Sequence, residues 1–267
     1  MRSPEMAART LRLAGWVETS LVDVLGEVSF TIWFCGCNFR CPWCQNAPVV
    51  LGTACRDVPL SELLEAISEA RLLADYVQAT GGEPTLQAEG LRALFEACKD
   101  QLGVKTSLDT NGARDNVVKG LLEAGLVDHF AMDVKAPLAE PDKYARVVGL
   151  PAGKAGDTVG RVRSSLVLAL DMAPFVEIRT TFVPNLHTRE DILIIASELA
   201  ELGLAKHPRA YYVLQQFSPG ENPLDPAFAQ VMRPPADFLL ALAREAKEQA
   251  GLPAVYVRTQ EAGVVEV

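Results

Sequence analysis

The sequence lacks any long uninterrupted apolar run, although 49% of its 267 residues are hydrophobic. A helix that crosses a bilayer needs about 20 consecutive apolar residues, and the opening stretch MRSPEMAART has no apolar core of the signal-peptide kind. We therefore expect a cytoplasmic protein with no membrane partner. The apolar content is still sufficient to bury one full core, so we predict a single domain over residues 1–267.

Positive charge is also scarce, because 25 Lys and Arg residues face 34 Asp and Glu residues and give a formal net charge of −9. Binding to the phosphates of a nucleic acid needs clustered Lys and Arg, so the composition argues against such a partner. Histidine is rare as well. The three histidines, which are scattered and are assigned no role, are His129, His187 and His207.

Short runs rich in β-branched residues alternate with segments of helical periodicity from residue 29 onward. The predicted strands lie near 29–34, 75–80, 104–109, 128–134, 175–183, 210–216 and 254–258. The predicted helices lie near 60–73, 88–101, 113–125, 158–171, 188–203 and 235–250. Strands joined by right-handed helical crossovers run parallel, which leaves an open α/β sheet or a complete or partial barrel. Six such units favour a barrel.

The remaining segments are interpreted relative to this repeat. Residues 1–28 are expected to form a short arm or hairpin, residues 29–217 the barrel, and residues 218–267 a C-terminal helix and an extra strand. The segment 138–157 contains two Pro and three Gly residues. Because both residue types interrupt regular structure, we predict a long loop there, over one mouth of the barrel.

Four of the six cysteines fall within ten residues, directly after the first predicted strand. Thiolates at the spacing of Cys37, Cys41 and Cys44 can bind three irons of a [4Fe-4S] cluster and leave the fourth iron open to a small molecule. The alternative is a structural zinc site with Cys35 as the fourth ligand, but only Cys41 and Cys44 form the Cys-x-x-Cys pair that zinc knuckles usually have twice. The two cysteines expected to be ordinary small buried residues are Cys55 and Cys98.

The Cys-x-x-x-Cys-x-x-Cys run, together with Gly81-Gly82-Glu83-Pro84 after the second strand, resembles the signatures of the radical S-adenosylmethionine (SAM) superfamily. The resemblance extends from Thr19 to about Thr259 and implies a partial (β/α)6 TIM-type barrel of parallel strands, with the cluster at its open mouth. Within the superfamily, the segments SLVDVLG, GCNFRCPWCQN, TGGEPTLQ, LDTNG, MDVKAP and IRTTFVP are similar to the activating enzymes of glycyl radical enzymes. The likeness is greatest to anaerobic ribonucleotide reductase activating proteins.

Two departures leave the partner open. That subgroup commonly has Tyr-Pro at the position of Val24-Leu25, and His at the position of Gln45. Neither departure touches the cysteines that would hold the cluster.

In a barrel, the carboxyl ends of the strands share one face, where ligands bind. Adjacent glycines let the backbone approach a ligand closely, and the resemblance implies that Gly81 and Gly82 receive the ammonium group of the cofactor, whereas read alone they form a simple turn. The residues predicted to bind the cofactor are Trp43, Gly81, Gly82, Glu83, Asp109, Asn111, Asp133, Lys135, Arg179 and Gln215.

Charged side chains end the third, fourth and fifth strands. Asp109 and Asp133 would repel each other unless a positive charge lies between them. Lys135 could supply that charge. The resemblance offers a different cation, a metal ion held by these two carboxylates and Thr110. Trp43 could stack beside the adenine or only shield the cluster from water.

Arg179 needs an anionic partner, because a buried guanidinium without one is costly. The carboxylate of the methionine moiety would fit. An ordinary salt bridge to Glu177 or Asp171 is the alternative.

The resemblance implies a radical SAM oxidoreductase that cleaves SAM reductively at the cluster to a 5′-deoxyadenosyl radical, with electrons from a donor such as flavodoxin or ferredoxin. The radical would take hydrogen from a glycine of a partner glycyl radical protein. An activator of the dehydratase type would carry eight further cysteines, which are missing. The alternatives are a radical SAM enzyme acting on a small molecule in biosynthesis and a non-catalytic, zinc- or cluster-stabilised binding protein.

Overall fold

The computed structural model describes residues 9–151 and 153–267. It divides into two compact units. Unit 1 contains the described residues up to Asn38, then Pro48–Thr110 and Asn116–Phe130, and unit 2 contains Phe39–Ala47, Asn111–Asp115 and Ala131–Val267. The predicted single domain over 1–267 stays a prediction.

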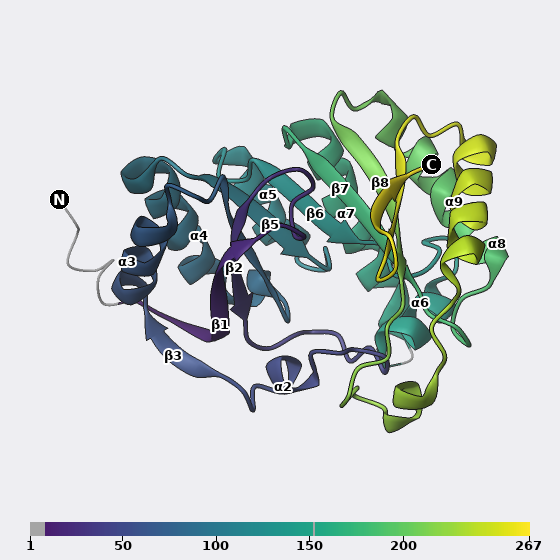
Figure 1. Cartoon of the computed structure of the whole chain (residues 1–267), viewed down its shortest axis with the longest axis horizontal. Coiled ribbons are helices and arrows are strands. Elements are labelled where there is room, and N and C mark those ends of the chain that lie inside the picture. The colour runs from purple at the N-terminus through teal and green to yellow at the C-terminus, as the bar shows by residue number, and fades with distance from the viewer. Residues whose placement is uncertain (1–8, 152) are drawn as a thin grey trace. The chain divides into compact units, whose positions relative to one another are not determined.

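Unit 1 is built on strands in the order β5-β4-β2-β1-β3 (Figure 1). Their bounds are β1 Thr10–Ser20, β2 Ser29–Phe34, β3 Arg56–Pro59, β4 Tyr76–Gly81 and β5 Lys105–Thr110. Strands β2, β4 and β5 run parallel, while β1 pairs antiparallel with both β2 and β3. The residues of unit 1 that are predicted to bind the cofactor lie at the carboxyl ends of these parallel strands.

Helices cover the strands of unit 1 through apolar stripes. The first predicted helix, α3 (Leu60–Ala70), buries Leu60, Leu63, Leu64 and Ile67 along one stripe, which explains why this segment folds against a sheet. The other helices are α2 Ala47–Val50, the 3₁₀ turn Pro84–Gln87, α4 Ala88–Ala97 with a π-helical turn Cys98–Leu102, and α5 Asp115–Glu123.

Unit 2 contains a second run of strands in the order β10-β9-β8-β7-β6. Their bounds are β6 His129–Asp133, of which the last three residues belong to this unit, β7 Val176–Phe182, β8 Ala210–Gln216, β9 Val255–Thr259 and β10 Gly263–Glu266. Strands β7, β8 and β9 are parallel, and β10 returns antiparallel to β9. The helices are α6 Pro141–Val148, α7 Ala155–Met172, α8 Arg189–Glu201 and α9 Ala236–Ala250, with 3₁₀ turns at Leu204–Lys206 and Pro226–Gln230.

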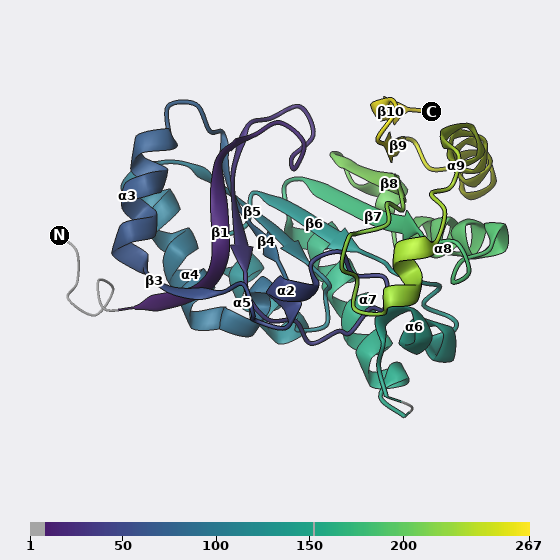
Figure 2. The same cartoon turned by 60° about the horizontal axis from the view of Figure 1, so that its bottom comes forward.

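The two faces of the β7–β8–β9 sheet differ in polarity. One face buries apolar side chains such as Leu214 and Val257 completely, and α8 and α9 lie side by side next to these strands (Figure 2). The opposite face carries polar residues, because side chains alternate along a strand. The polar residues that share this face by register are Glu177, Arg179, Thr181, Tyr211, Gln215 and Arg258.

The predicted strands match those of the structure to within a few residues, but the segment 138–157 is not a long loop. It contains α6 and the first residues of α7. Pro141 occupies the first turn of α6, and Gly149 ends it in a left-handed conformation, so these two of the residues interpreted as loop signals mark the ends of a helix. Tyr144 and Val148 are buried along the stripe between them.

The N-terminal arm is also more regular than expected, since β1 is a strand of eleven residues. The sequence pattern did not predict β3, β10 or the short helix α2. Within the described residues, the structure contains no helix with the length and apolar character needed to cross a membrane.

Candidate functional site

The first cysteine of the predicted ligand set, Cys37, follows β2 in unit 1 and is a half-buried cysteine that forms no disulfide. Its neighbour Cys35 is joined to Cys55 in a disulfide. The prediction of Cys55 as an ordinary buried thiol was therefore wrong. A disulfide sulfur offers no thiolate to a metal, so Cys35 is not available as the fourth ligand of the alternative zinc site.

The other two cysteines, Cys41 and Cys44, lie in unit 2 and form no disulfide. The segment that carries them is anchored to the end of α6, because Arg40 N donates to Val148 O at 2.9 Å and Trp43 Nε1 donates to Val147 O at 3.1 Å. The helix missed by the sequence pattern is thus what holds this part of the cysteine loop.

Gly149 is central to that anchoring. Its φ is +66°, and a Cβ placed on it would lie 2.0 Å from the carbonyl oxygen of Arg40. Both the left-handed conformation and the close approach require glycine. The backbone beside Cys41 is therefore held against a position that tolerates no side chain.

The glycine turn after β4 packs on the start of the cysteine loop within unit 1. Gly82 N donates to Phe34 O and Glu83 N donates to Gly36 O, both at 2.8 Å. A Cβ on Gly81 would lie 2.5 Å from the Phe34 backbone, and one on Gly82 would lie 2.0 Å from Gly36 O. The two glycines let this turn lie directly against the residue that precedes Cys37.

Glu83 is fully buried beside this turn. Its carboxylate accepts hydrogen bonds from Thr85 N at 3.0 Å and from Thr110 Oγ1 at 2.8 Å. These bonds tie the turn to the end of β5. A contact between Glu83 and the cofactor stays a prediction.

The predicted residues at the end of β5 have local partners. Asp109 accepts a hydrogen bond from Thr80 Oγ1 at 2.8 Å within unit 1, and Asn111 Oδ1 accepts one from Ala113 N at 3.0 Å within unit 2. Among residues 9–151 and 153–267, no three His, Cys, Asp or Glu side chains are grouped as metal ligands. The metal cation near Asp109 stays a prediction.

Unit 2 brings together three of the predicted charged residues. Asp133 lies between Lys135 Nζ and Arg179 Nε, each 2.8 Å from one of its carboxylate oxygens. Burial alone would raise the pKa of Asp133, but the charges of Arg179 and Lys135 outweigh it and hold that pKa well below its usual range. Asp133 is therefore ionised at neutral pH.

Lys135 also faces the cysteine segment, since its Nζ lies 5.2 Å from the centre of the Trp43 ring. Burial alone would lower the pKa of Lys135, but the negative charges of Asp133 and then Cys41 raise it. Lys135 is thus a permanent cation that contacts both Trp43 and Asp133.

His187, to which the sequence assigned no role, fixes the backbone of Lys135. Its Nδ1 accepts from Val183 N at 2.9 Å, so its Nε2 carries the proton and donates to Lys135 O at 2.8 Å. Burial, the largest effect, lowers the pKa of His187, which keeps the ring neutral as this arrangement requires.

Arg179 has two anionic partners inside unit 2. Besides Asp133, its Nη1 lies 3.6 Å from Glu177 Oε1, so the salt bridge to Glu177 that was weighed at the sequence level exists. The fully buried Glu177 also accepts from Tyr211 Oη and from Arg258 Nη2. Tyr211 and Arg258 lack any local sequence signal and were missed.

A cavity in unit 2 lies apart from these residues. It has a volume of about 590 Å³ and is lined by Phe182, Pro184, Met232, Arg233 and Phe238, among others. None of the predicted site residues lines it.

Comparison with known proteins then decides the family. The pattern of the radical SAM superfamily matches residues 31–166. A protein of Methanocaldococcus jannaschii that is named as a glycyl-radical enzyme activating enzyme is 31% identical over 240 residues, which cover 88% of this chain and 92% of the relative. The chain belongs to the radical SAM superfamily. It is therefore an enzyme, and the non-catalytic alternative is wrong.

Further relatives are partial matches. The pyruvate formate-lyase 1-activating enzyme of Escherichia coli is 35% identical over 131 residues, covering 46% of this chain and 52% of the relative. A 7-carboxy-7-deazaguanine synthase of Hyperthermus butylicus is 38% identical over 87 residues, covering 33% and 36%. These relatives place this radical SAM enzyme among the activating-enzyme type and leave its substrate undecided.

The fold is confirmed by a solved structure, QueE from Escherichia coli. It matches 97% of this chain and 100% of QueE with a TM-score of 0.57 at 14% identity. The likeness shows the fold alone, and it confirms the predicted partial barrel.

The radical SAM family implies a [4Fe-4S] cluster and SAM, and the residues present fit the cluster. Cys37, Cys41 and Cys44 form no disulfide and lie within eight residues of one another in the sequence, and thiolates are the ligands that such clusters take. Within the described residues, the structure does not group their side chains as a ligand set. The nearby Cys35 and Cys55 are occupied by each other. Binding of the cluster by these three sulfurs, with one iron left without a cysteine, stays a prediction.

Proposed function

We propose that this radical SAM enzyme activates a glycyl radical enzyme by removing a hydrogen atom from a glycine of that partner protein. The observation that carries the proposal is the 31% identity to an activating enzyme over 92% of the relative's length. The finer likeness to anaerobic ribonucleotide reductase activating proteins stays a prediction.

In this proposal, Cys37, Cys41 and Cys44 hold the cluster. When bound, the cluster and SAM supply the electron transfer and the radical that this chemistry requires. The chain's own residues bind and orient the cofactor, and they exclude water from the site. Trp43, backed by Lys135 at 5.2 Å, shields the segment between the second and third cysteines.

The polar residues of the site would orient the cofactor. Gly81 and Gly82 present backbone at the turn beside Cys37, and the residues of unit 2 predicted to assist are Asn111, Asp133, Lys135 and Arg179. Because Lys135 and Arg179 already neutralise Asp133, a metal cation between Asp109 and Asp133 is the weakest part of the predicted set. A flavodoxin or ferredoxin as electron donor, and a cytoplasmic location, complete the proposal.

Anaerobic reconstitution tests the proposal. We expect about four irons and four sulfides per chain, formation of 5′-deoxyadenosine on reduction with SAM, and a glycyl radical signal by electron paramagnetic resonance (EPR) when a glycyl radical protein is added. Cys41→Ala should lose the cluster and the product. The double variant Cys35→Ser, Cys55→Ser is the matched control, because it removes two cysteines that form a disulfide and should keep the cluster.

A second candidate function is hydrogen abstraction from a small molecule in biosynthesis. It is favoured by the 38% identity to a 7-carboxy-7-deazaguanine synthase, which covers 33% of this chain. Formation of 5′-deoxyadenosine that is stimulated by a small molecule, with no glycyl radical signal from any partner protein, would support this candidate and contradict the first.

A further inference from the structure

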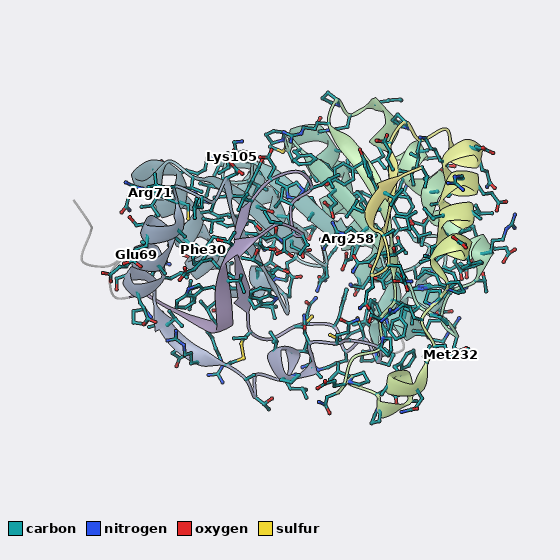
Figure 3. All side chains as sticks on the ribbon, viewed as in Figure 1. Phe30, Glu69, Arg71, Lys105, Met232 and Arg258 are labelled. Carbon is teal, nitrogen blue, oxygen red and sulfur yellow. A yellow bond between two sulfur atoms is a disulfide. The ribbon has the colours of Figure 1, made fainter. Side chains whose placement is uncertain are left out.

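The polar face of the β7–β8–β9 sheet in unit 2 contains two side chains that have hydrogen-bonding groups without a protein partner among the described residues. The register pairs Gln215 of β8 directly with Arg258 of β9, so both side chains point to the same face. Figure 3 shows Arg258 on the side of the strands away from α9. This is also the face of Arg179, since Thr181 of β7 pairs with Gln215.

Arg258 is only partly satisfied by protein groups. Its Nη2 donates to Glu177 Oε1 at 3.2 Å, but its Nε is buried and has no hydrogen-bond partner among the described residues. Glu177 cannot satisfy the whole guanidinium, because its carboxylate also receives the hydroxyl of Tyr211 and lies 3.6 Å from Arg179. A buried donor left without an acceptor is unfavourable, so the arrangement calls for a further acceptor.

Gln215 supplies a second uncommitted group beside the first. Within the part of the chain that the structure describes, its side-chain amide makes no hydrogen bond, and the residue is half-buried. The side chain of Arg258 is 19% exposed, so a ligand can reach it. A guanidinium and an amide donor on adjacent strands form a site for an anionic oxygen.

We propose that Arg258 and Gln215 bind a carboxylate of the molecule from which this enzyme takes hydrogen. The inference rests on the proposed radical function and goes beyond it by giving the substrate a charge. Planar guanidinium matches both carboxylate and phosphate. The buried Glu177, 3.2 Å from the same guanidinium, favours the singly charged carboxylate, because it repels a doubly charged phosphate more strongly.

Equilibrium binding to the reconstituted, SAM-loaded enzyme tests this inference, since it needs no turnover. Two pairs of ligands are compared by ligand-observed NMR: a blocked Gly-Asp peptide with its Gly-Asn twin, and benzoate with benzamide. In at least one pair, we expect the acid to bind about tenfold more tightly than its neutral twin, because a hydrogen bond between charged groups accounts for about that difference in affinity. In Arg258→Gln the ratio should fall to about one, and Arg258→Lys should restore part of it.

Two controls separate binding from structure. Arg244→Gln removes the same charge from an exposed position of α9 and should keep the acid preference. Tyr211→Phe removes a donor from Glu177 without touching Arg258 and should also keep it. Tighter binding of the acid in the peptide pair alone assigns the carboxylate to a protein partner. Tighter binding of benzoate alone assigns the carboxylate to a small molecule. Both results support the inference.

Three results would overturn the inference. They are equal binding of acid and neutral twin by the unmodified enzyme, an acid preference that survives in Arg258→Gln, and loss of SAM binding in Arg258→Gln, which would mean that Arg258 serves the cofactor. Failure of the proposed function appears elsewhere, as absence of cluster or of 5′-deoxyadenosine, so the two failures are distinguishable.

Discussion

Replacing Gly149 by alanine should loosen the cysteine segment of unit 2. The new Cβ would lie 2.0 Å from Arg40 O, which is backbone and cannot turn aside, and the residue would keep a φ of +66°. The left-handed conformation costs about 1 kcal/mol for a residue with a Cβ, and relieving the overlap costs about 1–3 kcal/mol more. The free energy of unfolding should therefore fall by about 2–4 kcal/mol.

Gly251→Ala is the matched control for this change. Gly251 also ends a helix with a positive φ, +63°, but a Cβ on it would meet nothing within 4 Å. Gly251→Ala should therefore lower the free energy of unfolding only by the cost of the left-handed conformation, about 1 kcal/mol. Urea unfolding of both variants measures the difference, and iron content after anaerobic reconstitution shows its consequence, because the backbone displaced by Gly149→Ala adjoins Cys41. Equal losses of stability and equal iron content in the two variants would refute the reasoning.

Three other predictions concern charge and sulfur. Asp133→Asn should lower the free energy of unfolding by about 2–3 kcal/mol, since it leaves the buried Arg179 without its 2.8 Å partner; an unchanged urea midpoint would contradict this. The variant Cys35→Ser, Cys55→Ser should lose about 3 kcal/mol of its free energy of unfolding, because the disulfide joins residues 20 positions apart. A mass increase of two hydrogen atoms on reduction of the unmodified protein checks that the bond forms. Burial raises the pKa of Cys98 to about 12, so the folded state keeps a proton that the unfolded state loses and stability should fall as pH rises from about 9 to 12. Cys98→Ala should make that alkaline fall measurably shallower in urea titrations, and an identical slope would argue against the shift.

The strands and the cysteine ligands could be predicted from sequence because their signals are local. The apolar run 29–34 matches β2 to the residue, and the stripe of α3 follows from spacing alone. The spacing of Cys37, Cys41 and Cys44 likewise depends on neighbouring positions. In each case the pattern that predicts the feature is contained in a few consecutive residues.

The features that were missed depend on contacts between distant residues. Proline and glycine at both ends of α6 were taken as loop signals because either residue can mark a boundary or an interior break, and only the tertiary structure shows that α6 anchors Trp43. The pairing of Cys35 with Cys55 cannot be deduced from sequence, since connectivity is not written in spacing. The contact of Arg258 with Glu177 joins residues 81 positions apart.

We propose that three thiolates hold a cluster with one iron left for SAM. EPR spectroscopy of the anaerobically reconstituted and reduced protein, with and without SAM, is the sharpest test of this arrangement. We expect the signal of a reduced [4Fe-4S] cluster whose shape changes when SAM is added. A protein that contains zinc in place of iron, or a cluster signal that stays the same with SAM, would contradict it.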